Sequence, residues 1–155
     1  MHGDTAATDR QLAEARAAFD RSDVAGAETL ARTVLTGAPA REDAAMLLAR
    51  VLQSQGRLRA AAEVLLDVCA ANAFEPALSL RAATFARQCD RHTVAARICA
   101  GAIARGTVSP EFLVLAGNVA REAGDFETAR ARYLVALDAG VDLEQQHVLG
   151  ALANT

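Results

Sequence analysis

The chain has 155 residues, enough for one domain with a continuous core, and 52% of them are apolar. Gly and Pro are sparse, at 10 and 3 residues, which favours helices over a turn-rich β fold. All 16 basic residues are Arg, but the net charge of −3 argues against general nucleic-acid binding, which needs a basic surface.

The sequence predicts neither a membrane span nor a signal peptide. It has no uncharged apolar stretch of about 18 residues, and its first residues lack an apolar segment. The three cysteines, Cys69, Cys89 and Cys99, form an odd set without metal-ligand spacing. Because Cys69 and Cys99 fall on apolar helix positions, we expect small core residues in a reduced, cytoplasmic protein.

Apolar residues at three- and four-residue steps predict helices along almost the whole chain. In chain order, the helices are expected over residues 8–21, 24–36, 42–54, 58–71, 76–88 and 92–105, then from Pro110 to a break at Gly124-Asp125, and from Phe126 to Gly140. Residues 1–7 are expected to form a disordered tail. Residues 142–155 are expected to form a partial capping helix.

The chain also repeats itself at a fixed period. Ala27, Ala61, Ala95 and Ala129 are 34 residues apart, within segments that align without gaps. Each aligned segment begins with a turn-forming residue: Ser22, Gly56, Asp90 and Gly124. A fixed period of this length indicates stacked helix pairs, each of which buries its apolar face against its neighbours.

These residues resemble the tetratricopeptide repeat (TPR) family, whose motif has about 34 residues. The fourth repeat matches best, with Gly117-Asn118, Gly124-Asp125-Phe126, Ala129, Tyr133 and Ala136-Leu137. The third repeat departs from the motif at Asp90 and Cys99. The first has Gln11 and Glu14 on its expected inner face, so Leu12 and Phe19 are expected to form that face instead.

The resemblance covers residues 8–141 as four repeats, 8–41, 42–75, 76–109 and 110–141. It implies an all-α, right-handed α-solenoid of four helix pairs plus a short C-terminal helix. In this family the first helix of each repeat lines a concave groove, which implies an apolar stripe of Leu12, Met46, Leu80 and Val114. The groove residues implied for partner binding are Arg16, Met46, Arg50, Leu80, Arg81, Arg87, Val114, Asn118 and Arg121.

Arginine beside an apolar stripe suits a peptide with acidic and aliphatic side chains, because guanidinium groups bind carboxylates with two parallel hydrogen bonds. The alternative is that these arginines are solvated or paired with neighbouring acids such as Glu122.

No catalytic, cofactor or metal site is expected. The chain lacks the motifs of phosphate, dinucleotide and zinc sites, and its three histidines, His2, His92 and His147, are isolated. His92 is expected to pack between helices. Cys89, His92 and Cys99 are expected to point in different directions, which disfavours a shared metal. Most carboxylates near turns or helix N-termini, such as Asp23, Asp43 and Asp125, are expected to cap helices or to interact favourably with the helix dipole.

The sequence therefore predicts a non-catalytic protein-interaction scaffold that binds a protein or peptide partner, but neither nucleic acid nor membrane. The alternative is a regulatory, targeting or self-association domain at the N-terminus of a larger bacterial enzyme, such as a sulfotransferase, methyltransferase or hydroxylase. The apolar, short tail favours this alternative, since it suits continuation of the chain or contact between terminal repeats of two copies.

Overall fold

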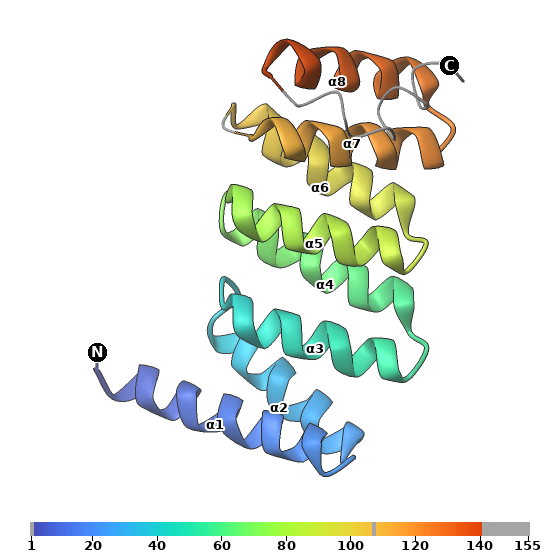
Figure 1. Cartoon of the computed structure of the whole chain (residues 1–155). Coiled ribbons are helices and arrows are strands. Elements are labelled where there is room, and N and C mark those ends of the chain that lie inside the picture. The colour runs from blue at the N-terminus through green and yellow to red at the C-terminus, as the bar shows by residue number, and fades with distance from the viewer. Residues whose placement is uncertain (1, 107, 141–155) are drawn as a thin grey trace. The chain divides into compact units, whose positions relative to one another are not determined.

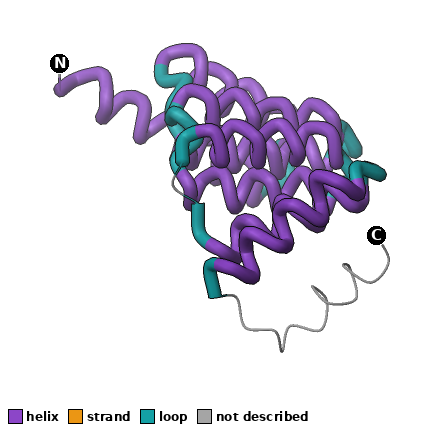
Figure 2. The backbone as a smooth tube through the Cα atoms, turned by 90° about the horizontal axis from the view of Figure 1, so that it is seen from above, coloured by secondary structure: helices purple, strands orange, loops and turns teal. Residues whose placement is uncertain are grey.

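The computed structural model of the chain describes residues 2–106 and 108–140, and all regular elements in these ranges are α-helices joined by short loops (Figures 1 and 2). The helices are α1 (His2–Asp20), α2 (Val24–Gly37), α3 (Glu42–Ser54), α4 (Leu58–Ala71), α5 (Pro76–Gln88), α6 (His92–Ala104), α7 (Pro110–Glu122) and α8 (Phe126–Asp138). The predicted capping helix at 142–155 lies outside the described residues.

The chain divides after Asn72 into two compact units. The N-terminal unit contains α1–α4 and the C-terminal unit contains α5–α8. In the N-terminal unit α1 packs on α2, α3 packs on α4, and α2 packs on α3, while α1 also contacts α3 (Figure 1). The C-terminal unit repeats this arrangement with α5–α8. Each unit is therefore two helix pairs whose first helices touch, which confirms the all-α repeat fold.

The same backbone turn ends the first helix of every pair. Ser22, Gly56, Asp90 and Gly124 all have a positive φ, at 65°, 72°, 56° and 82°. The next residue in each case donates its N–H to a carbonyl five residues earlier, for example Asp23 to Ala18 at 2.8 Å and Asp125 to Ala120 at 2.9 Å. This is the hydrogen bond of a Schellman motif, which satisfies a carbonyl left free at a helix end. The 34-residue period seen in the sequence is thus a period of backbone conformation.

Side-chain caps begin four of the helices. Asp23 accepts a hydrogen bond from the Gly26 N–H at 2.9 Å, and Asp125 accepts one from Thr128 at 3.1 Å. Glu75 and Ser109 cap α5 and α7 in the same way, each immediately before a Pro in the first turn. The capping prediction for Asp23 and Asp125 is confirmed. Asp43 lies in the first turn of α3, as expected for an acid near the helix N-terminus, and accepts hydrogen bonds from the Ala44 N–H and from Arg41.

The first helix differs from its predicted length. α1 begins at His2, so residues 2–7, expected to be a disordered tail, are helical. This segment contains no proline, so the helix can extend through it toward the N-terminus. Its inner face matches the prediction: Leu12 is only 2% exposed, and Phe19 packs against the buried cluster that Leu12 belongs to, while Glu14 is exposed.

Small residues allow the helices of the C-terminal unit to pack closely. Ala129 and Ala136 are completely buried beside Tyr133, whose ring lies against Gly117 of α7. All three cysteines are buried, and the core prediction for Cys69 and Cys99 is confirmed. Burial raises the pKa of the Cys99 thiol to about 12.

Candidate functional site

The predicted binding residues of the N-terminal unit lie where α1 and α3 meet. At one end of this contact Arg41 donates to Asp9 of α1 at 2.6 Å and to Asp43 of α3 at 2.7 Å. The Arg41 guanidinium lowers the pKa of Asp43 below its ordinary value. Arg16 also approaches Asp43, at 3.6 Å, and both side chains are largely exposed. The charges at this end therefore balance one another.

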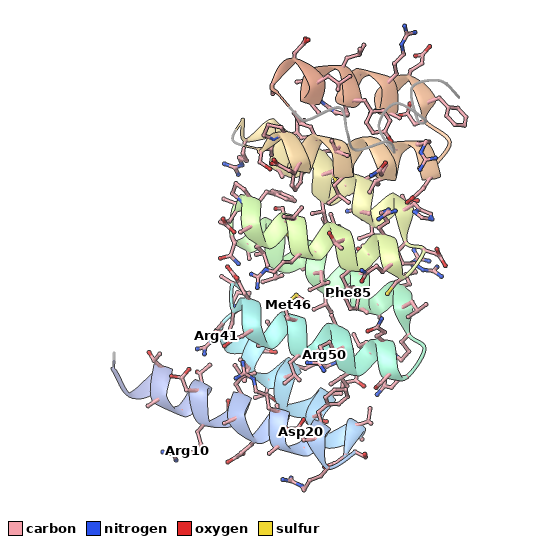
Figure 3. The ribbon with its side chains drawn as sticks, in the orientation of Figure 1. Arg10, Asp20, Arg41, Met46, Arg50 and Phe85 are labelled. Carbon is pink, nitrogen blue, oxygen red and sulfur yellow. The ribbon has the colours of Figure 1, made fainter. Side chains whose placement is uncertain are left out.

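Further along the same contact, Arg50 of α3 extends over the ring of Phe19 of α1. The guanidinium carbon is 5.7 Å from the ring centre, within the range of a cation–π contact. Arg50 is exposed and has no hydrogen bond or ion pair to any other described residue. Met46, half-buried, lies one helical turn before it (Figure 3). We call Arg16, Phe19, Met46 and Arg50 the Arg50 face.

In the C-terminal unit, two of the predicted groove residues are engaged in internal bonds. Arg87 of α5 donates its Nε to both oxygens of Glu122 of α7, at 2.8 and 3.0 Å. Asn118 accepts a hydrogen bond from the Tyr133 hydroxyl at 2.8 Å. Arg87 therefore pairs with an acid, as the alternative interpretation expected. The Arg87 bonds join α5 to α7, and the Asn118 bond joins α7 to α8.

His92, at the start of α6, also lies beside Glu122. Its Nδ1 is 3.4 Å from a Glu122 oxygen, and the side chain is 28% exposed. It therefore occupies a partly buried position beside Glu122 of α7, a neighbour that the predicted packing role did not specify. The Tyr133 hydroxyl nearby has its pKa raised by burial, an effect that the Arg121 guanidinium opposes.

The other predicted groove residues of this unit reach the surface to different degrees. Leu80 is 38% exposed, and Arg81 and Arg121 are exposed. Val114 is half-buried and packs against the cluster of Ala120, Ala129 and Tyr133. Leu12, predicted as part of the apolar stripe of the groove, is instead buried in the core of the N-terminal unit.

Sequence reasoning missed the ionic links on the second helices. Glu28 of α2 accepts hydrogen bonds from Arg32, Gln55 and Arg57 at 2.9–3.0 Å. The Gln55, Arg32 and Arg57 hydrogen bonds lower the pKa of Glu28 to about 2, against a smaller opposing effect of burial. The i,i+4 spacing of Glu28 and Arg32 was a local signal for one of these bonds. The other two join α2 to the turn after α3, and no local pattern indicates that these two segments face each other.

Within residues 2–106 and 108–140, no three His, Cys, Asp or Glu side chains gather closely enough to hold a metal ion. None of the helices described combines the length and apolar character needed to cross a bilayer.

No protein-family model and no curated protein matches the sequence. Solved structures do match in fold. A crystal structure of MamA protein is 16% identical, covers 94% of this chain and 78% of its own, and has a TM-score of 0.62. A thermophilic TPR protein of Thermus thermophilus is 21% identical over 90% of this chain and 78% of its own, with a TM-score of 0.54. The chain has the fold of the tetratricopeptide repeat proteins.

A third TPR structure, from Parabacteroides merdae, supports the same assignment. It is 13% identical with a TM-score of 0.63, and the match covers 94% of this chain but only 58% of the Parabacteroides chain. At these identities the likeness is one of fold. Gly117 and Ala129 are the small residues of the repeat motif that let α7 pack closely on α8, and Tyr133 is the large residue that packs against Gly117.

Proposed function

We propose that this TPR chain is a non-catalytic protein-interaction scaffold that binds an acidic, partly aliphatic segment of a partner protein on the first helices of its repeats. The observation that carries this proposal is Arg50. Its side chain is exposed on the Arg50 face, and no carboxylate among the described residues neutralises it.

The contact with Phe19 prepares Arg50 for a carboxylate. A guanidinium that stacks on an aromatic ring keeps its N–H groups directed outward along its edges, where they match the two oxygens of a carboxylate. Because the side chain is already held, less rotamer entropy is lost when a partner binds. Met46, one turn away, adds a flexible apolar contact for an aliphatic side chain.

The C-terminal unit also presents arginine and apolar side chains on its first helices. Leu80 and Arg81 are adjacent on α5, and Arg121 is exposed near the end of α7. Arg87 and Asn118 support this surface through their bonds to Glu122 and Tyr133. We therefore propose that Arg81 and Arg121 contact a partner directly, while Arg87 and Asn118 hold the helices that present them.

The experiment is a pull-down from native lysate with the wild-type chain, the Arg50→Glu variant and the Arg59→Glu variant. Arg59 is an exposed residue of α4, so its reversal changes the net charge equally without touching the Arg50 face. We expect a partner that wild type and Arg59→Glu capture and Arg50→Glu loses. Identical captures by all three proteins, each with an unchanged melting temperature, would contradict the proposal.

The alternative of a domain within a larger enzyme has one supporting observation among the described residues. Phe126, Leu134 and Val135 of α8 are 47–51% exposed, which suits contact with another polypeptide. The Arg50 face favours the scaffold proposal because it combines apolar contacts with a charge that no described acid neutralises.

A further inference from the structure

A cavity lies in the N-terminal unit between α2, α3 and α4, and it is separate from the Arg50 face, which is built on α1 and α3. Its volume is about 360 Å³, and its apolar lining comes from Leu35, Pro39, Leu48, Val64 and Val68. Pockets that bind ligands typically start at about 300 Å³ and are mostly apolar with a few polar groups. The cavity therefore has the size and lining of a binding site.

Burial shows how the cavity is built. Leu48 and Val68 are both 1% exposed and form its floor. Leu35 of α2 and Val64 of α4 are half-buried and also line it, and Pro39, which follows the C-cap of α2, is exposed. A side chain that entered here would cover apolar surface of both second helices.

Two charged residues border the cavity. Arg32 shares Glu28 with Arg57, whereas Asp67 has no ion pair within the described part of the chain. Arg32 donates its Nε and its Nη2 to Glu28 at 2.9 Å, and Glu28 is ionised at neutral pH because its hydrogen bonds hold its pKa near 2. Asp67 of α4 is exposed and has no hydrogen bond or ion pair to any described residue. Asp67 is therefore the charged residue at the cavity that has no ion pair among the described residues.

We propose that this cavity is a second binding site, which takes an aliphatic side chain of a partner peptide whose neighbouring Lys or Arg pairs with Asp67. The aliphatic side chain replaces water on Leu48, Val64 and Val68, and the basic residue forms the ion pair that Asp67 lacks. This site uses the second helices and prefers a basic segment, so it is independent of the acidic segment proposed for the Arg50 face.

The test is an NMR titration of the ¹⁵N-labelled chain with two matched peptides, acetyl-Ala-Leu-Arg-Ala-amide and acetyl-Ala-Leu-Glu-Ala-amide. We expect the Arg peptide to shift amide signals of α2 and α4 saturably, and the Glu peptide to need a concentration at least several-fold higher. Asp67→Asn should reduce this preference to near equality, and Val64→Phe, which fills the cavity, should abolish the shifts.

Asp138→Asn is the matched control, because Asp138 is an exposed acid of α8 in the other unit. It should leave the titration unchanged. The proposal is overturned if both peptides bind equally to wild type, if Asp67→Asn keeps the preference, if the shifts map outside α2–α4, or if neither peptide causes saturable shifts. Because Asp67 is exposed, its variant should fold even if Val64→Phe does not.

Discussion

Individual residues set how closely these helices approach, and Gly117 is the clearest case. A Cβ atom at this position would overlap the ring of Tyr133, which is fully buried and donates its hydroxyl to Asn118 at 2.8 Å. The sequence indicated Gly117 and Tyr133 as repeat positions because each falls on the 34-residue motif. The hydrogen bond to Asn118 could not be predicted, since it depends on how α7 and α8 are rotated against each other.

Gly117→Ala should destabilise the protein by about 1–3 kcal/mol, because the added methyl group forces Tyr133 away from α7. The measurement is the free energy of unfolding from urea denaturation. Gly37→Ala is the control: Gly37 ends α2, and a Cβ there has no neighbour within 4 Å. That variant should be as stable as wild type or slightly more stable. Equal stability of the two variants would show that α7 and α8 do not pack as described.

Whole elements were the most predictable feature of the chain. The bounds expected for α2–α7 agree with the structure within one residue, because turn residues act locally and recur at every repeat, and side-chain caps mark the starts of α2, α5 and α7. The start of α1 was wrong because the helix runs through residues 2–7, which contain no proline to stop it. Contacts between elements were harder, and the links from Glu28 of α2 to Gln55 and Arg57 join residues 27 and 29 positions apart.

The Glu28 links make a prediction for pH. The pKa of Glu28 is lowered from 4.5 to about 2 in the folded protein, so folding favours its ionised form. Its contribution to stability is therefore complete above the unfolded pKa and is lost as the pH falls toward 2. Glu28→Gln should lower stability at about pH 5 and lose less further stability than wild type between about pH 5 and pH 3.

Urea denaturation at the two pH values gives this difference directly. Part of the acid sensitivity should persist in the variant, because Asp43, Glu75 and Asp125 also have lowered pKa values. If wild type and Glu28→Gln lose the same stability over this range, the ionic link between α2 and the turn after α3 does not stabilise the fold.

For the molecule as a whole, the sequence predicted the repeat fold but only some of the exposed charges. The period and small residues were sufficient for the fold. Arg50 and Arg87 both lie on the first helix of a repeat. Arg50 lies over the ring of Phe19 without a described acidic partner, whereas Arg87 is bound to Glu122. This difference depends on which side chains face each other between neighbouring first helices. The cavity beside Asp67 was missed for the same reason, since three helices form it.

The most direct test of the scaffold proposal is calorimetric titration of the partner captured by wild type into wild type, Arg50→Glu and Arg59→Glu. If Arg50 pairs with a carboxylate of the partner, Arg50→Glu should raise the Kd about tenfold or more, which corresponds to at least about 1.4 kcal/mol. Arg59→Glu should bind as wild type does. Equal Kd values for wild type and Arg50→Glu, with both proteins folded, would contradict a binding role for the Arg50 face.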